Sequence, residues 1–235
     1  MLSAYEGRKM LSANTRRPLL IGHRGAPSLA KENSLASFRR ALEEGLDGVE
    51  LDVHLTKDGI FAVRHDFETP LGPVWQLGFD ELIAVEPQTP RLEEVLELVA
   101  AFGDRFVNVD LKSIPGMGGL QALALARVLR GRDRVWVSSF DPTALLVLAR
   151  ARAGVPLAFL VAEDESASLV DCLPIAAIHP HYSLVSAERV KSWHSRGLAV
   201  VVWTVNAPEL AQRLVGMGVD GLIGDHPYVL LGARG

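Results

Sequence analysis

Short apolar runs and longer stretches of helical period alternate along this chain, and that order constrains the fold more than any other feature. The apolar runs have the length of strands and occupy residues 19–22, 48–53, 106–111, 135–139, 156–161, 175–178, 198–205 and 221–224. Amphipathic stretches such as 34–45 and 91–103 separate many of them. Strands that alternate with helices predict a parallel sheet, and eight such strands favour an α/β fold of the (β/α)₈ TIM barrel type. An open doubly wound sheet is the alternative, but no GxGxxG motif follows the first strand.

The two ends of the alternating region have similar sequences. GLDGVELD at 45–52 matches GVDGLIGD at 218–225, and each reads as a helix that ends in Gly, a turn and a strand. Equivalent units at both ends suit a closed ring in which the first and last strands are neighbours. The apolar fraction of 49% is sufficient for one full-sized core. We therefore expect a single domain over 18–235, preceded by a flexible N-terminal tail over 1–17.

Charged side chains follow the predicted strands at several successive ends. Glu50 and Asp52 project from the same face of one strand because strand side chains alternate. Two acids alone would be typical of an edge strand with one wet face. The other strand ends, however, add His23, Arg24, Arg64, His65, Asp66, Asp110, Lys112, Trp203 and Asn206. The carboxyl ends of the strands are where TIM barrels have their active sites, so this set indicates a functional site.

The types of residue in this set point to a reaction class. Glu50, Asp52 and Asp110 supply only oxygen ligands, which suit Mg²⁺ or Ca²⁺ better than zinc. Arg24 and Lys112 can neutralise a bound anion such as a phosphate. The histidines His23 and His65 can exchange protons near neutral pH. A divalent cation, a phosphate clamp and two histidines together indicate phosphoester cleavage.

At these residues the chain resembles the glycerophosphodiester phosphodiesterase family, over nearly its whole length. The matching stretches are GHRGA (22–26), KENSLASFRRALEEGLDGVELDVHLTKDG (31–59), VRHD (63–66), PRLEEVL (90–96), NVDLK (108–112), SSF (138–140), WTVN (203–206) and GVDGLIGDHP (218–227). The resemblance implies a (β/α)₈ barrel that hydrolyses glycerophosphodiesters to sn-glycerol 3-phosphate and an alcohol with a divalent cation. It implies catalysis by His23 and His65, metal ligation by Glu50, Asp52 and Asp110, and phosphate contacts from Arg24 and Lys112.

The chain departs from the family pattern at three places. Lys31 replaces a proline in the KENS stretch, while Ser34 keeps a hydroxyl that can cap the next helix. The third carboxylate is Asp110, where relatives more often have Glu. Residues 67–89 lack the usual RTT-like segment and form a short connection, so we expect a more open site. The specificity for the alcohol stays open on this evidence.

Several further residues have ordinary structural interpretations. We interpret His54 as a residue behind the ligands or facing solvent, rather than as a ligand. His179 and His181 are expected in a loop that packs around the barrel rim, and His194 and His226 are expected to be structural. Cys172 is expected to be a small buried residue. Phe140 and Trp203 either wall the pocket or belong to the core, and the face of Trp203 could pack on glycerol carbons or on a quaternary ammonium.

Charge and hydropathy argue against a nucleic-acid partner and against membrane insertion. A net charge of −4 gives no basic footprint for nucleic acid, and no apolar run reaches the roughly 18 residues of a transmembrane helix. The opening residues MLSAYEGRKMLSANTRRP lack the apolar region of a secretory signal, and Met10 is an alternative start. A single cysteine excludes an internal disulfide and is compatible with a reducing compartment. We therefore expect a cytoplasmic protein.

Two other functional classes were weighed against a metal-dependent hydrolase acting on small glycerophosphodiesters. An inactive binding module should have lost a histidine or a carboxylate, and none is lost. A sphingomyelinase-like or lysophospholipase D-like lipid phosphodiesterase would need an exposed apolar loop, for which 67–89 offers only Val74, Trp75 and Phe79. We expect one histidine to protonate the leaving alkoxide and the other to accept a proton from the attacking hydroxyl, with the order open.

Overall fold

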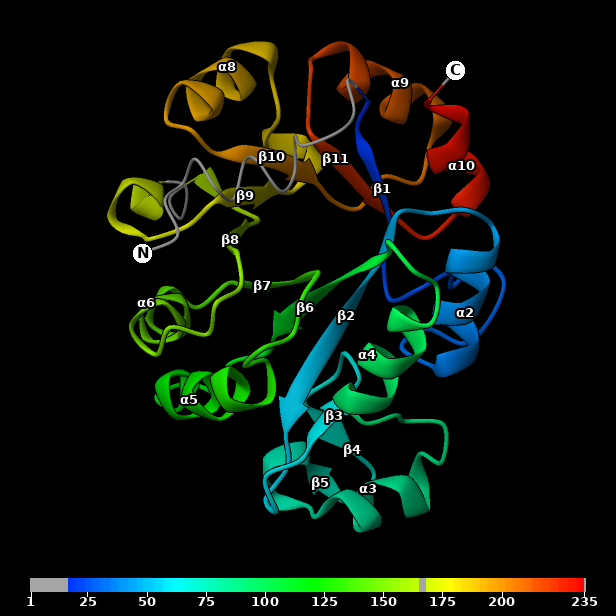
Figure 1. Ribbon diagram of the computed structural model, residues 1–235, viewed down its shortest axis with the longest axis vertical. Helices are drawn as coiled ribbons and strands as arrows, with labels where there is room; N and C mark the ends of the chain where they lie inside the picture. Colours follow the sequence, from blue (N-terminus) through cyan, green and yellow to red (C-terminus); the bar gives the residue numbers. More distant parts are fainter. Residues whose placement is uncertain (1–16, 165–167, 235) are drawn as a thin grey trace.

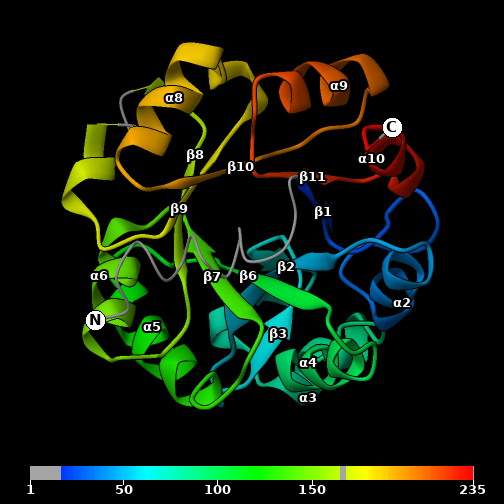
Figure 2. The same cartoon turned by 45° about the horizontal axis from the view of Figure 1, so that its top comes forward.

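The computed structural model describes residues 17–164 and 168–234, in which eight parallel strands form a closed ring (Figure 1 and Figure 2). These strands are β1 (Leu19–Gly22), β2 (Gly48–Leu55), β6 (Phe106–Leu111), β7 (Val135–Ser139), β8 (Leu157–Val161), β9 (Ala177–Pro180), β10 (Ala199–Val202) and β11 (Gly221–Gly224). Each pairs with the next, and β1 pairs with both β2 and β11. The predicted TIM barrel is confirmed.

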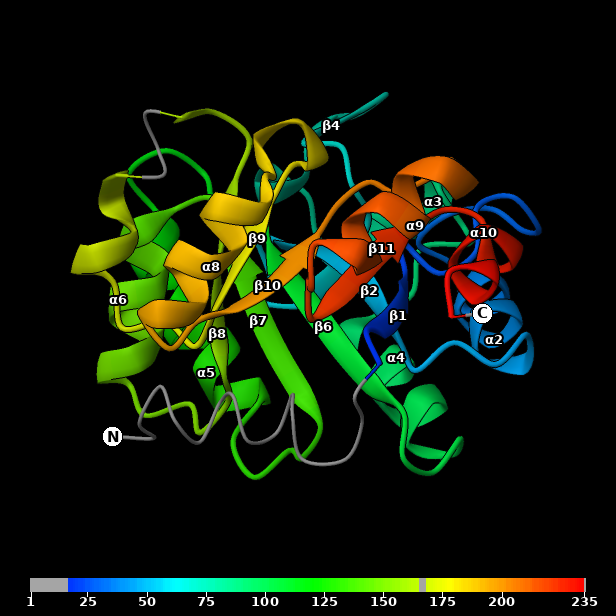
Figure 3. The same ribbon diagram turned by 90° about the horizontal axis from the view of Figure 1, so that it is seen from above.

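Helices surround the ring on its outside, as Figure 2 and Figure 3 show. They are α2 (Leu35–Glu43), α4 (Leu92–Ala100), α5 (Gly118–Val128), α6 (Pro142–Arg150), α8 (Ala187–Ser195), α9 (Pro208–Gly216) and α10 (Pro227–Gly232). Among the described residues, none of the helices combines the length and the apolar composition that crossing a bilayer requires. Residues 1–16 of the expected tail lie outside the described part of the chain, so the domain boundary stays a prediction.

The repeated sequences LDG (46–48) and VDG (219–221) make equivalent contacts at the start of β2 and β11. Asp47 Oδ2 accepts a hydrogen bond from the Leu20 amide at 2.7 Å, and Asp220 Oδ2 accepts one from the Val200 amide at 2.8 Å. Each aspartate therefore ties the start of its strand to a neighbouring strand. Gly48 follows Asp47, and a Cβ there would lie 2.5 Å from the Phe106 carbonyl oxygen. The close approach of β2 to β6 thus requires glycine at this position.

The two faces of the strands separate the core from the functional site. Alternate residues such as Val49, Leu51 and Val109 belong to the large apolar core between the strands and the helices. A smaller cluster contains Ile21, Phe106, Trp136, Val201 and Ile223, with Leu19 and Trp203 packed against it. Since side chains alternate along a strand, the polar residues of β2 and β6 lie on the face opposite the large core. The buried outward face therefore fixes the register that brings the acids together.

Residues 60–89 pack more tightly against the barrel than the sequence suggests. The segment contains β3 (Phe61–Val63), antiparallel to β2, the two short strands β4 (Glu68–Thr69) and β5 (Gly72–Pro73), the 3₁₀ turn η1 (Val74–Gln76) and α3 (Phe79–Val85). Val74 and Phe79 are buried with Ala62 and Leu82 in a cluster of their own. Two of the three candidates for an exposed apolar loop, Val74 and Phe79, are therefore buried and do not form one. Arg64 also lies outside the pocket described below, because its guanidinium binds Glu86 at 3.0 Å.

Two smaller expectations are corrected by the structure. Cys172 ends the 3₁₀ turn η2 (Ser168–Cys172) and is exposed rather than buried, because that turn packs against the protein only through Val170. His179 lies within β9 and is fully buried, and not in a rim loop. His181 does lie just after β9, before the 3₁₀ turn η3 (Tyr182–Leu184), where its Nδ1 contacts the Ser183 hydroxyl at 2.7 Å.

Candidate active site

All nine residues predicted for the site line one pocket of about 170 Å³. They lie in or just after β1, β2, the short strand Phe61–Val63, β6, β7 and β10, and are His23, Arg24, Glu50, Asp52, His65, Asp110, Lys112, Phe140 and Trp203. Asn108, Leu160 and Ile223 complete the lining among the described residues. The structure therefore brings the predicted residues together, although they are spread along the chain from His23 to Trp203.

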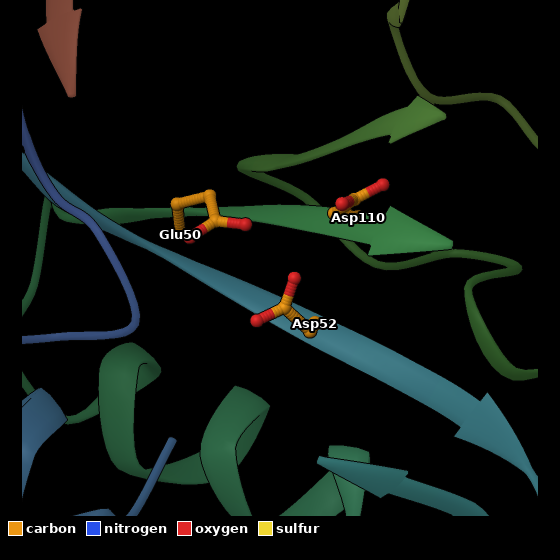
Figure 4. A group of neighbouring side chains, drawn as sticks. All are labelled: Glu50, Asp52 and Asp110. Carbon is orange, nitrogen blue, oxygen red and sulfur yellow. The ribbon is translucent and has the colours of Figure 1, made fainter. Parts of the chain in front are cut away.

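Three carboxylates form the acidic part of the pocket (Figure 4). Glu50 and Asp52 come from β2 and Asp110 comes from β6, where Asp52 is the direct register partner of Asp110. One oxygen from each residue can be chosen so that all three lie within 4.8 Å of one another. The alternation of side chains on β2 and the parallel pairing with β6 are together sufficient to create this group.

Burial and mutual repulsion make this group costly to ionise fully. Burial raises the pKa of Glu50 to about 7, and the nearby Asp52 carboxylate adds to the effect. Burial also raises the pKa of Asp110. Burial acts in the same direction on Asp52, but the Lys112 ammonium and the Arg24 guanidinium outweigh it and hold the pKa of Asp52 below its usual value. The pocket thus favours the presence of positive charge beside Glu50 and Asp110.

The acidic group has the donor atoms that a divalent cation requires. The Oδ1 atom of Asp110 is buried and has no hydrogen-bond partner among the described residues. A buried acceptor without a donor costs free energy unless another group, such as a cation, satisfies it. The three candidate ligands are all carboxylates, with no cysteine or histidine in the group. Residues of this kind fit Mg²⁺ or Ca²⁺.

Lys112 bridges two of these acids. Its Nζ lies 2.8 Å from Asp52 Oδ1 and donates to Asp110 Oδ2 at 2.6 Å. Burial alone would lower the pKa of Lys112, but the two carboxylates outweigh burial and raise it above the usual value. Lys112 therefore stays positively charged and offsets part of the negative charge of the pocket.

Arg24 is held in place by its backbone and by its guanidinium. Its backbone adopts the left-handed conformation with φ of 51°, and its amide donates to Glu50 Oε2 at 3.0 Å. The adjacent Gly25 has φ of 91°, and a side chain there would collide with α2. The guanidinium binds Glu32 at 2.9 Å and lies 3.2 Å from Asp52. Arg24 is thus fixed over the acidic group before any anion arrives.

His23 is oriented by an acid that the sequence reasoning did not single out. Its Nδ1 donates to Asp225 Oδ1 at 2.7 Å, and Asp225 is itself fixed by Asn206 through both the backbone amide, at 2.8 Å, and the side chain. Burial opposes protonation of His23, but the Asp225 hydrogen bond and the Glu50 charge outweigh it and raise the pKa of His23. Because Nδ1 is engaged, Nε2 is the nitrogen that can exchange a proton with a ligand.

His65 lies at the other side of the pocket and is more exposed. Its Nδ1 donates to Asp66 Oδ1 at 2.9 Å, and its carbonyl oxygen accepts a hydrogen bond from His54 Nε2 at 3.0 Å. His54 is 1% exposed, and burial lowers its pKa to about 4. Of the two positions expected for His54, the one behind the site agrees with this burial and the solvent-facing one is wrong. His54 holds the backbone of His65 as a neutral residue.

Two aromatic side chains form one wall of the pocket. The rings of Phe140 and Trp203 meet edge to face with centroids 5.7 Å apart. Trp203 Nε1 donates to the His179 carbonyl oxygen at 2.7 Å, which fixes the plane of the indole. Both residues line the pocket, so the interpretation of them as wall residues agrees with the structure.

Two residues that the sequence reasoning passed over support the site. Asn33 donates from its side chain to Asp52 Oδ2 at 2.8 Å, and Asp225 orients His23 as described above. The signal for Asp225 was present, because it is an acid placed directly after the last strand. Asn33 follows Glu32 in the loop before α2, where position alone gives no sign of its partner. Ser34 does cap α2 as expected, accepting a hydrogen bond from the Ser37 amide at 3.2 Å.

Comparison with known proteins gives a consistent result. Residues 23–229 match the model of the glycerophosphoryl diester phosphodiesterase family. The chain is 32% identical to a glycerophosphodiester phosphodiesterase of Caldanaerobacter subterraneus, over 92% of this chain and 97% of that protein. It is 30% identical to an enzyme of the same name from Bacillus altitudinis, over 88% of this chain and 94% of that protein.

Solved structures show the same similarity. A phosphodiesterase of Oleispira antarctica, solved in complex with its product sn-glycerol-3-phosphate, superposes with a TM-score of 0.83 at 27% identity, over 92% of this chain and 96% of that one. A glycerophosphodiester phosphodiesterase of Thermotoga maritima gives 0.79 at 27% identity, over 94% and 100% of the two chains. With a matching family model over most of its length and an intact acidic pocket, this chain belongs to the glycerophosphoryl diester phosphodiesterase family.

Proposed function

We propose that this protein hydrolyses glycerophosphodiesters to sn-glycerol 3-phosphate and an alcohol in the pocket described above. One observation carries the proposal: three buried carboxylates, two cationic side chains and two histidines line a single pocket in a member of this family. The bound product of the similar Oleispira antarctica enzyme supports the identity of the phosphate-containing product. Such products would enter glycerol and lipid metabolism.

Glu50, Asp52 and Asp110 would hold a divalent cation, Mg²⁺ or Ca²⁺. When bound, the cation would act as a Lewis acid that offsets charge on the phosphoryl oxygens. The chain supplies the rest of the positive field through Lys112 and Arg24. Both are already fixed by ion pairs with Asp52, so little side-chain ordering is needed when a phosphate binds.

His23 and His65 would exchange the two protons that hydrolysis requires. They line the same pocket from different strand ends, and each has Nδ1 held by an aspartate. One histidine accepts a proton from the attacking hydroxyl, and the other gives a proton to the leaving alkoxide. Asp225 holds His23 rigidly, while Asp66 is exposed and holds His65 more loosely.

The test is an assay of the chelated protein. Glycerophosphocholine, glycerophosphoethanolamine and glycerophosphoglycerol are each incubated with metal-free protein, and Mg²⁺ or Ca²⁺ is then restored. The proposal predicts release of sn-glycerol 3-phosphate only after a divalent cation is added. Full activity in the presence of chelator, or no release with either cation, would refute it. The cytoplasmic location expected from the sequence stays a prediction.

A further inference from the structure

A second and larger pocket opens beside the first. It has a volume of about 620 Å³, compared with about 170 Å³ for the pocket that contains the carboxylates. His65, Lys112 and Phe140 line both pockets. A diester whose phosphate lies in the smaller pocket can therefore extend one of its two substituents past these three residues into the larger one.

The larger pocket is built from the segments that follow β3, β6 and β7. Its floor includes Gly118, the first residue of α5, where a Cβ would lie 1.8 Å from Asp141 Oδ2. Glycine is thus required at this position, because the Asp141 carboxylate already occupies the space of a side chain. This loop geometry sets the Asp141 carboxylate into the wall of the pocket.

Charge and aromatic surface give the larger pocket a preference for cations. Among the described residues that line it, the carboxylates are Asp141 and Asp66, and Asp66 is already hydrogen-bonded to His65. The ammonium of Lys112 is likewise paired with two acids of the smaller pocket, which leaves Asp141 as the carboxylate of the larger pocket without a cationic partner among these lining residues. Asp141 Oδ1 accepts from the Thr143 amide at 2.8 Å as the cap of α6, and Oδ2 takes no part in that contact. Phe67 and Phe140 are 36% and 45% exposed. Carboxylates beside aromatic rings are the surroundings that bind ammonium groups.

We propose that this larger pocket, called the alcohol pocket, binds the leaving alcohol and selects small alcohols that carry an ammonium group, such as ethanolamine or choline. This inference rests on the proposed hydrolysis of glycerophosphodiesters. Asp141 faces the ammonium, and Phe140 packs against it inside the larger pocket. Lys112 Nζ already lies 6.0 Å from the Phe140 ring centroid, so the ammonium lies on the Asp141 side of the ring and not at the border of the two pockets. Trp203 lines only the smaller pocket, so it packs on the glycerol carbons and not on the cation.

The experiment compares kcat/KM of the wild type and Asp141→Asn for two cationic substrates and one neutral substrate. Asparagine keeps the oxygen that caps α6 and removes only the charge, since Asn and Asp are equally good caps. The substrates are glycerophosphocholine, glycerophosphoethanolamine and glycerophosphoglycerol. Asp104→Asn is the matched control, because it removes an exposed carboxylate just before β6, at the opposite end of that strand.

We expect Asp141→Asn to lower kcat/KM for both cationic substrates about fivefold, while that for glycerophosphoglycerol changes less than twofold. Asp104→Asn should leave all three values unchanged. Equal losses on all three substrates, or an unchanged ratio of cationic to neutral substrate, would overturn the alcohol pocket while the hydrolase stands. No turnover of any substrate by the wild type would instead overturn the proposed function, and this inference with it.

A second variant covers the case in which Asp141→Asn does not fold. Phe140→Leu keeps an apolar side chain and removes the aromatic face, so it should lower the same ratio. Inhibition by free choline should weaken in this variant, and inhibition by sn-glycerol 3-phosphate should not. A ratio and a choline inhibition equal to those of the wild type would contradict the assignment.

Discussion

Replacing Asp225 by Asn tests whether the acid behind His23 serves the reaction. The substitution keeps the size of the side chain and the hydrogen bond from the backbone amide of residue 225 to Asn206, but removes the charge that faces His23 Nδ1 at 2.7 Å. Without the carboxylate, the positively charged imidazolium form of His23 loses its negatively charged partner. Its pKa must therefore fall, because the Asp225 hydrogen bond and charge are among the causes that raise it.

The size of the effect follows from the type of contact. The two side chains are 18% and 26% exposed, so solvent screens the pair only in part. A hydrogen bond to a charged group contributes about 1.5 to 3 kcal/mol. If that stabilisation is needed when His23 is protonated in the transition state, kcat falls by about 10-fold to 150-fold.

The assay is the pH profile of kcat/KM for the wild type and Asp225→Asn. The limb that belongs to His23 should move to lower pH, whether this histidine acts as the base or as the acid. Asp220→Asn is the matched control: Asp220 pairs with His194 at 2.8 Å and similar exposure, but neither residue lines either pocket. A wild-type kcat and an unmoved profile for Asp225→Asn would refute the reasoning.

Three further predictions concern single residues. His23→Ala and His65→Ala should each lower kcat by about 10² to 10⁴, with the metal-dependent rise in melting temperature retained; near-normal turnover in either would exclude that histidine as an acid or base. In metal-free protein, the pKa of Glu50 is raised from 4.5 to about 7, so the folded state binds the proton more tightly than the unfolded state. The free energy of unfolding should therefore fall by about 3 kcal/mol as the pH rises from 4.5 to 7. Denaturant titrations of the wild type and Glu50→Gln at pH 5 and 8 measure this difference, and equal pH slopes would contradict it. Gly48→Ala should destabilise the fold by about 1 to 3 kcal/mol, because the new methyl group would collide with the Phe106 carbonyl oxygen. Thermal melting measures this loss. An unchanged melting temperature would show that β2 and β6 can move apart at no cost.

The barrel could be predicted because its determinants are local and repeated. Each strand candidate was marked by its own apolar run, and the similarity of 45–52 to 218–225 indicated that the first and last strands, β1 and β11, are neighbours. The candidate site followed from the fold, since alternate positions on parallel strands converge at one end of a barrel. Glu50 and Asp52 alone were compatible with an edge strand, and the charged residues at the other strand ends identified them as part of a site.

What the sequence reasoning missed depends on contacts between distant segments. Asp225 and His23 are 202 residues apart, and their hydrogen bond exists only once the ring closes. Residues 67–89 were interpreted as a short connection that leaves the site open, because they lack the RTT-like segment of relatives. Val74 and Phe79 nevertheless find a buried position against β3, which no pattern within the segment predicts. Burial of His179 in β9 likewise reflects a strand that continues two residues beyond its apolar run.

The central claim is that Glu50, Asp52 and Asp110 bind a divalent cation that hydrolysis requires. The most direct measurement titrates Mg²⁺ and Ca²⁺ into chelator-treated wild type, Asp110→Asn and Asp110→Glu, following the melting temperature and the release of sn-glycerol 3-phosphate together. The account predicts that wild-type stability rises with the logarithm of metal concentration, by about 2.7 kcal/mol at a hundredfold excess over Kd. Asp110→Asn should lose both the stabilisation and the activity, and Asp110→Glu should keep a measurable part of each. If Asp110→Asn retains both responses at wild-type metal concentrations, Asp110 is not a ligand and this account of the site is wrong.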